Sequence, residues 1–248
     1  MRAFNSVIII AGIVFLAISS GTGKGSVFAE GIEARFQSKE KLVYSVYFNG
    51  IPSGYIEWEY LGRQVVGGIT ADVLSVNSDT NIFNLLDLDS KEKVFLDIKT
   101  SLPIKVERDI VFFGKKEIIE ETYDQEKGQI KIKRGSSKDP EDILSQDTPI
   151  HNILELLYFF PQDVALEAGK WMTFNFPTQK IRIKMVKERV LKMNGVRHDT
   201  YFLIGRGAKK FSLWLDKEKR MPLRLEFISM AGKVTVVRKP VSPAGGES

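Results

Sequence analysis

Two histidines are the first residues in this chain that could carry chemistry, because histidine often transfers protons or binds metals near neutral pH. They are His151 and His198, and they do not form a ligand-spaced pair. His151 lies four residues after Asp147, and the two side chains could form an acid–base dyad. The alternative is that this segment only fixes the start of a helix. His198 lies beside Asp199 in an alternating segment, where we expect a surface or strand-pairing role.

Three aspartates could suggest a glycosidase or a calcium site, since both need converging carboxylates. They are Asp87, Asp89 and Asp97, and they lack the glycine and terminal glutamate of a calcium loop. The chain has no cysteine, which excludes thiolate catalysis. It also lacks the motifs of serine hydrolases, phosphate-binding loops and dinucleotide-binding folds. We therefore predict a protein that is not an enzyme and has no metal or other cofactor.

Aromatic side chains are concentrated at positions that should face the inside of the fold. Such residues usually form a core, but in an open sheet they could line an apolar groove that binds an acyl chain. The candidate ligand-binding residues are Tyr44, Phe48, Trp58, Tyr60, Tyr158, Phe159, Trp171 and Trp214.

Two segments place cations at every second position, which puts them on one face of a strand. They carry Lys131 and Lys133 in one case and Lys180, Arg182 and Lys184 in the other. Charged strand faces commonly point to solvent and prevent edge-to-edge aggregation. The alternative is a patch that contacts anionic envelope polymers or lipid head groups.

The N-terminal segment has the pattern of a secretion signal. An apolar run of 12 residues, 7–18, precedes a glycine-rich stretch and the small residues of Val27-Phe28-Ala29. As a helix the run would cover only about 18 Å of a roughly 30 Å hydrocarbon layer. We predict cleavage after Ala29, an uncleaved membrane anchor being the alternative. Lipoprotein processing is excluded because it requires a cysteine.

The remaining chain is expected to form one β domain, residues 41–239, after a linker at 30–40 and before a disordered tail at 240–248. Removal of Arg2 and Lys24 lowers the formal net charge from +5 to +3. This mild excess does not indicate nucleic-acid binding. The secretion signal predicts that the mature protein is located in the periplasm or the cell envelope.

Most of the domain alternates apolar and polar residues with the period of a β-strand. Strands are predicted near residues 41–48, 54–61, 69–76, 91–98, 104–113, 116–124, 129–134, 171–176, 181–193, 196–204, 211–215, 223–229 and 233–238. Asn49-Gly50 and Asn194-Gly195 are hairpin signals. Helices are predicted at 80–88 and 150–160, and residues 135–149 should form the longest surface loop. The expected fold is mainly β, a curved antiparallel sheet or partly closed barrel wrapped around one or two short helices.

Several short motifs together resemble the domain-of-unknown-function family 3108 of exported bacterial proteins. They are the Leu42-x-Tyr44-x-Val46 strand with Gly54, the aromatic helix at 156–161 followed by Gly169, and Leu213-Trp214-Leu215-Asp216 with Arg220, Pro222 and Leu223. The resemblance covers roughly residues 41–238 and implies an envelope location with no assigned chemistry. Phe160 stands where the family would have a basic residue. The layout is also similar to periplasmic lipoprotein carriers of the Lol type, in which a curved sheet encloses an apolar cavity.

The leading hypothesis is a non-enzymatic envelope protein that binds a lipid, a lipoprotein or another amphipathic component in a concave β cavity. A second hypothesis is a scaffold that recruits an envelope protein partner through a strand edge. An envelope hydrolase built from the acids and histidines is the third.

Overall fold

A computed structural model describes residues 41–82, 86–135, 141–158, 166–229 and 231–240. The predicted signal peptide and linker lie outside these ranges, as does the predicted tail from residue 241. The first eight strands are β1 (Lys41–Phe48), β2 (Ile51–Val66), β3 (Ile69–Ile82), β4 (Leu86–Asp97), β5 (Pro103–Phe112), β6 (Lys115–Asp124), β7 (Gln129–Arg134) and β8 (Asp142–Ser145). After helix α1 (Ile153–Tyr158) come β9 (Trp171–Phe176), β10 (Gln179–Met193), β11 (Val196–Arg206), β12 (Lys210–Asp216), β13 (Pro222–Ile228) and β14 (Lys233–Arg238).

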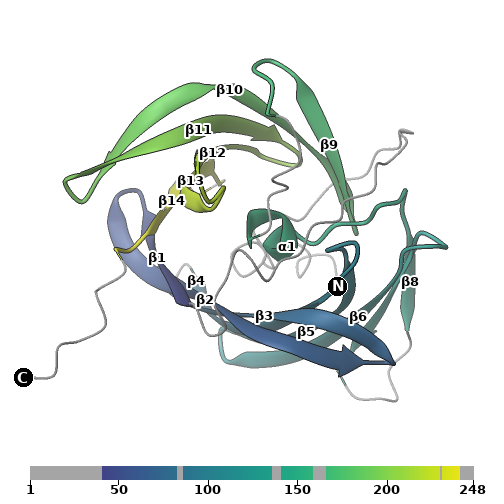
Figure 1. Cartoon of the computed structure of the whole chain (residues 1–248). Coiled ribbons are helices and arrows are strands. Elements are labelled where there is room, and N and C mark those ends of the chain that lie inside the picture. Colours follow the sequence, from purple (N-terminus) through teal and green to yellow (C-terminus); the bar gives the residue numbers. More distant parts are fainter. Residues whose placement is uncertain (1–40, 83–85, 136–140, 159–165, 230, 241–248) are drawn as a thin grey trace, which may run out of the picture.

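All the described strands belong to one antiparallel sheet that curves around α1 (Figure 1). The strand order is β8-β7-β6-β5-β4-β3-β2-β1-β14-β13-β12-β11-β10-β9. Strands β8 and β9 are therefore the two ends of the sheet, and the barrel is not closed by pairing between them. The predicted fold class, a curved antiparallel β-sheet around a short helix, is confirmed.

Local sequence explains two of the hairpins. Asn49 and Gly50 have φ of 49° and 83°, and Asn194 and Gly195 have φ of 50° and 79°. Two successive positive φ values give the turn that matches the twist of two paired strands, and asparagine followed by glycine adopts it with little strain. Both predicted Asn-Gly hairpins are confirmed by pairing of the flanking strands.

The main core lies on the inner face of the sheet, where it surrounds α1. In β1, alternate residues from Leu42 to Phe48 are buried, as the sequence pattern predicts. Inner residues of nearly every strand join one hydrophobic cluster with Leu154, Leu156 and Leu157 of α1. The helix is thus covered by the concave face of the sheet.

The predicted helix at 80–88 is wrong. Residues on both sides of the undescribed positions 83–85 extend the β3–β4 ladder, with Thr80 opposite Leu88 and Ile82 opposite Leu86. A nine-residue helix is marginal by itself, whereas extension of an existing ladder adds paired backbone groups. The ladder therefore outweighs the local spacing of apolar residues.

The predicted surface loop at 135–149 is also partly wrong, because it contains β8, which pairs with β7. The second predicted helix is shorter than expected at its start. It begins at Ile153, while Ile150 forms a parallel bridge to Asn175 of β9. Residues 159 and 160 lie outside the described ranges. Within these ranges, no helix has the length and apolarity needed to cross a bilayer.

Candidate binding site inside the curved sheet

The segment 146–158, here called the strap, connects the two ends of the sheet. The backbone N–H of Gln146 donates to the carbonyl oxygen of Gly128, in the β6–β7 turn, at 2.8 Å. The Gln146 side chain donates to the carbonyl oxygen of Phe176, at the end of β9, at 2.9 Å. Lys180 Nζ lies 2.7 Å from Asp147 Oδ2 and adds an ion pair to the same end. The strap thus joins edges that are not paired with each other.

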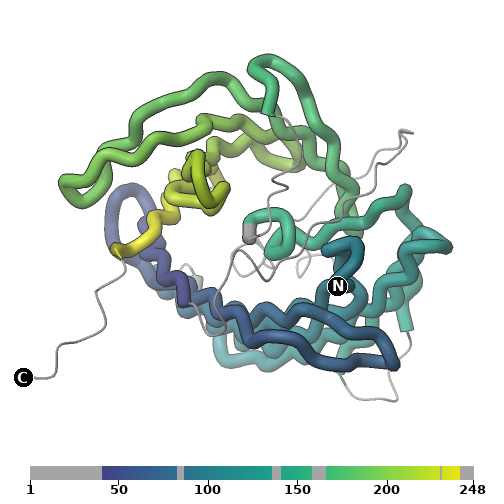
Figure 2. Tube along the Cα trace, viewed as in Figure 1, coloured from purple at the N-terminus to yellow at the C-terminus, as the bar shows by residue number. Residues whose placement is uncertain are grey.

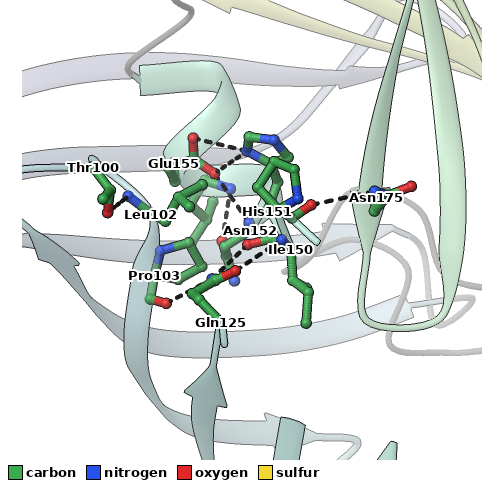
Figure 3. Close-up of polar contacts among 11 residues, drawn as sticks. Thr100, Leu102, Pro103, Gln125, Ile150, His151, Asn152, Glu155 and Asn175 are labelled. Atoms are coloured by element: carbon green, nitrogen blue, oxygen red, sulfur yellow. Dashed lines mark hydrogen bonds and ion pairs between the residues drawn. The ribbon is translucent and has the colours of Figure 1, made fainter. Parts of the chain in front are cut away.

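Gln125 anchors the middle of the strap (Figure 3). Its amide donates to the carbonyl oxygens of Ile150, at 2.9 Å, and Pro103, at 3.1 Å. Its Oε1 accepts from the Ile150 N–H at 3.0 Å. Ile150 is fully buried, so these bonds satisfy backbone groups that water cannot reach.

Replacement of Gln125 by alanine should lower the free energy of unfolding by roughly 1–3 kcal/mol, because both polar groups of the Ile150 backbone lose their partner. Urea denaturation measures this loss, and amide hydrogen exchange should increase across the strap. Gln129, half-buried at the start of β7, has no side-chain hydrogen bond within the described residues. Gln129→Ala is therefore the matched control, with a change of no more than about 0.5 kcal/mol. Equal effects of the two variants would contradict the anchoring role.

The start of α1 is capped by its own side chains. Asn152 Oδ1 accepts from the Leu154 N–H at 2.8 Å, and Glu155 Oε2 accepts from the Asn152 N–H at 3.1 Å. This reciprocal arrangement satisfies backbone donors at the helix start. Glu155 also lies 3.1 Å from His151 Nδ1, and both side chains are buried.

The possible dyad of His151 with Asp147 is wrong, because His151 pairs with Glu155 and Asp147 pairs with Lys180. His151 helps to fix the start of α1 through its contact with Glu155. Its ring also packs edge-on against Phe174, with 5.3 Å between the ring centroids. His198 is half-buried on β11, opposite Leu191 in the strand register.

The three candidate aspartates do not converge on one point. Asp87 and Asp89 both lie on the exposed face of β4, and Asp97 lies at the other end of that strand. There its Oδ1 accepts from the N–H groups of Lys99 and Thr100, which shapes a turn. Within the described residues, no group of three potential ligands is placed to bind a metal ion.

A buried ionic network crosses the inner face of β4, β5 and β6. Arg108 donates through Nε to Glu92 Oε2 at 2.7 Å and through its Nη1 to Glu121 Oε1. The hydroxyl of Tyr123 donates to Glu121 Oε2 at 2.7 Å. All four side chains are almost fully buried.

Burial is the main cause of the shifted pKa values in this network. It raises the pKa of Glu92, and together with the Glu121 charge it raises the pKa of Tyr123 well above its ordinary value. Burial opposes the charge of Arg108, but Glu121 and Glu92 outweigh it and raise the pKa of Arg108. Arg108 is therefore a permanent cation that faces two carboxyl groups and one neutral phenol.

Buried hydroxyl groups of β3 and β4 lie on the same inner face as the ionic network. We call the whole set the polar stripe: Ser78, Thr80, Ser90, Glu92, Arg108, Glu121 and Tyr123. The hydroxyls of Ser78 and Ser90 lie 2.8 Å apart. Thr80 Oγ1 and Glu92 Oε1 are buried and have no hydrogen-bond partner among the described residues. A buried polar atom without a partner costs roughly 1–3 kcal/mol, so a ligand that binds these oxygens would gain that energy.

The polar stripe was not predicted from the sequence. A signal was present in β4, where Ser90 and Glu92 stand at the parity of buried Leu88, Val94 and Leu96. A carboxylate on the apolar parity of a strand requires a buried partner. That partner, Arg108, comes from the next strand and could not be identified from local pattern.

Four of the candidate aromatic residues lie in the main core beside α1. Tyr44, Phe48, Trp58 and Tyr60 are buried there, and the rings of Tyr44 and Trp58 are 5.1 Å apart. The Tyr44 hydroxyl donates to the carbonyl oxygen of Pro222 at 3.0 Å. Tyr60 donates to Asp72 Oδ1 at 2.6 Å. These four side chains line the inner face, as predicted.

The other aromatic candidates are not part of this group. Trp214 packs on the outer face, in a separate cluster with Leu191 and Leu223, so its expected inner position is wrong. The expected inner position of Trp171 is also wrong, because Met172, Phe174 and Phe176 take the inner parity of β9 and leave Trp171 half-buried on the outer face, next to cations of β10 and β11. The side chain of Tyr158 and the whole of Phe159 lie outside the described residues.

The candidate cations lie on the outer face, on two separate strands. Lys180, Arg182 and Lys184 alternate with buried isoleucines on β10. Lys131 and Lys133 alternate with buried isoleucines on β7. The two strands stand near opposite ends of the sheet order, so the structure gives no single ladder of all five cations.

The outer face also carries a polar hollow of about 460 Å³ over β2, β3 and β4. Its lining residues are Tyr55, Glu57, Asn77, Ser78, Asp79, Asp89 and Lys91. The exposed lining residues place the hollow on the opposite face of the sheet from the strap, and Ser78 is the one lining residue that it shares with the polar stripe.

Comparison with known proteins gives a fold likeness without a function. The chain is similar to a crystal structure of a β-barrel-like protein of the domain of unknown function DUF1849 from Brucella abortus, with a TM-score of 0.54 and 9% sequence identity. The likeness covers 80% of this chain and 94% of the other. A candidate lipoprotein from Parabacteroides distasonis matches with a TM-score of 0.30 and 8% identity, over 82% of this chain and 94% of the other. No protein-family profile matches the sequence, and no curated protein matches it significantly.

Proposed function

We propose that this protein is a non-catalytic binding protein of the bacterial cell envelope that takes up an amphipathic molecule inside the curved sheet. The observation that carries the proposal is the polar stripe, which places two buried oxygens without described partners, on Thr80 and Glu92, beside a continuous apolar face. An amphipathic ligand matches both surfaces, because its chain would contact the apolar residues and its head would contact the stripe.

The charge of the stripe selects the kind of head group. One permanent cation, Arg108, is already bonded to both Glu92 and Glu121. The atoms that remain are oxygen acceptors, of which the Thr80 hydroxyl can also donate. A head group with hydroxyl or amine donors therefore fits better than a bare phosphate, which the two glutamates would repel.

The strap would have to move for such a molecule to enter. Helix α1 and Ile150 fill the interior, and the strap is attached by polar contacts at Gly128, Phe176 and Gln125. Displacement of the strap would break a few hydrogen bonds and uncover Ile150 and the leucines of α1, whose apolar contacts the chain of the ligand would have to replace. It would not require separation of two long paired strands. We therefore assign entry to the strap side of the barrel, between β8 and β9.

The envelope location is part of the proposal. It is supported by the secretion-signal pattern of residues 1–29 and by the sequence resemblance to family 3108. Membership of that family is likewise proposed.

The proposal predicts quenching of Trp58, which lies on the inner face at 4% exposure, by a brominated monoacylglycerol. The chain has three tryptophans, so Trp171→Phe with Trp214→Phe leaves Trp58 as the only reporter. Its fluorescence should fall in a saturable way, because bromine quenches only over short distances. The matched control retains Trp171 alone, on the outer face, and should change little. Absence of quenching of Trp58, with the fold confirmed by circular dichroism, would remove the proposal.

A strand-edge scaffold is the second candidate, and one feature of β8 favours it. Three of the four residues of this end strand are exposed, including Ile143 at 57% exposure, while Leu144 packs against the main core. Short exposed edges can accept an added strand. Co-purification of one stoichiometric envelope protein that is lost on Ile143→Pro, without any bound lipid, would favour the scaffold over the binding protein.

A further inference from the structure

Positive charge is concentrated on the β10–β11 hairpin. The two strands carry eight lysines and arginines, and their only acidic residues are Glu188 and Asp199, which gives a net charge of +6. Residues 30–248 together have a net charge of +3, so the rest of that chain is net acidic. The positive charge is therefore local to the hairpin and is not spread evenly over the protein.

Three of these cations meet at one aromatic ring. The guanidinium carbons of Arg182 and Arg206 lie 4.9 and 5.2 Å from the ring centre of Trp171, and Lys184 Nζ lies 4.9 Å from it. Within the described residues, none of the three forms an ion pair with a carboxylate. Contact with the ring offsets only part of the mutual repulsion. Such a group of cations favours a bound anion.

Towards its turn, the same hairpin combines cations with exposed apolar side chains. Arg189 lies over the ring of Phe202, with 6.0 Å between the guanidinium carbon and the ring centre. Val186 and Val196 are 37% and 57% exposed, whereas Val190 faces the other side of the hairpin from its outer-face neighbour Leu191. In Figure 2 the turn of the hairpin, drawn in green, reaches the left edge of the molecule above β1.

We propose that this outer surface, which comprises Trp171, Arg182, Lys184 and Arg206 together with the hairpin tip, docks the protein on a membrane surface rich in anionic phospholipid. Cations near such a surface are attracted to phosphate head groups. Exposed valines favour the interface over water, whereas a purely ionic polymer would offer them no apolar contact. This combination is the reason for choosing a lipid surface over a soluble polyanion.

The test is sedimentation of the full folded chain with vesicles of phosphatidylcholine, with and without phosphatidylglycerol. We expect binding only to vesicles that contain phosphatidylglycerol, and weaker binding as salt increases. The triple variant Arg182→Gln, Lys184→Gln, Arg206→Gln should bind about a hundredfold more weakly. The matched control, Lys91→Gln, Lys93→Gln, Lys99→Gln, removes the same charge from exposed positions in β4 and in the turn after it, and should bind like the unmodified chain.

A second readout locates the contact. Phosphatidylglycerol brominated in its acyl chains should quench Trp171 in the variant that retains only this tryptophan, and Val186→Ser with Val196→Ser should reduce the quenching. Equal losses in the two triple variants would show a non-specific charge effect and overturn the proposal. Binding to heparin without binding to vesicles would also overturn it, in favour of an anionic polymer. Because Trp58 reports the interior and Trp171 the outer face, either proposal can fail without the other.

Discussion

Replacement of Arg108 by methionine should destabilise the domain by roughly 3–5 kcal/mol, because it leaves Glu92 and Glu121 buried without an opposing charge. Methionine retains much of the apolar volume of the arginine stem, so the effect reports the lost charge more than a cavity. Urea denaturation at neutral pH gives the change in the free energy of unfolding. The matched control is Lys116→Met, which removes the cation of an exposed pair, Lys116 Nζ and Asp109 Oδ2 at 2.8 Å. Such pairs contribute about 0–1 kcal/mol.

The same variant should depend on pH in a defined direction. Burial raises the pKa of Glu92 above its ordinary value of 4.5, so the protonated form is favoured in the folded state. The stability that protonated Glu92 contributes is fully present below the pKa that Glu92 has in the unfolded chain. It is lost as the pH rises through the higher pKa that Glu92 has in the folded protein. Removal of Arg108 should raise the folded pKa further. The deficit of Arg108→Met should therefore shrink as the pH falls from neutral towards 4.5, and a deficit that stayed constant would argue against a buried charge network.

Replacement of Gly54 by alanine should cost roughly 2–5 kcal/mol, from the combined effects of backbone strain and steric overlap. Gly54 has φ of +155°, and an added Cβ would lie 2.1 Å from the carbonyl oxygen of Asp79 and 2.8 Å from Cα of Thr80. These are backbone atoms of β3, in register with β2, so relief requires the two strands to separate.

Gly50→Ala separates the two contributions to that cost. Gly50 has φ of +83°, but nothing lies within 4 Å of the position of its Cβ. Its substitution should cost only the strain of a left-handed residue, about 1–2 kcal/mol. Thermal or urea unfolding of both variants measures the difference, which is the effect of the overlap. Equal stabilities for the two variants would mean that β2 and β3 do not approach each other this closely at Gly54.

The sequence predicted the β architecture well because the relevant signals are local. Alternation in β1 and the Asn-Gly turns each depend on a few consecutive residues. The errors arise where a neighbouring strand decides the structure. The segment 80–88 follows the β3–β4 ladder, and β8 exists because β7 offers it a partner. Strand pairing over a distance cannot be identified from apolar spacing within one short segment.

The candidate site was less predictable than the fold. The four inner aromatic residues follow strand parity, but Trp214 does not share their face, and the register shifts between Trp214 and Leu215. The polar stripe depends on three strands placing Glu92, Arg108 and Glu121 side by side. The anchoring role of Gln125 depends on a segment that is distant in sequence. Pairing of distant segments therefore determines most of this site.

Strand β1 pairs with β14, while every other ladder in the described sheet joins strands that follow each other in the chain. The domain is thus assembled from two meanders, β1–β8 and β9–β14, that meet along a single seam. Each meander requires only short-range loop closure, whereas the seam joins residues nearly a whole domain apart. Because the entropic cost of loop closure grows only slowly with loop length, the seam lowers the free energy of unfolding only slightly. Contacts between residues so distant in sequence form slowly during folding. The order of assembly that follows is two arms first and their junction last.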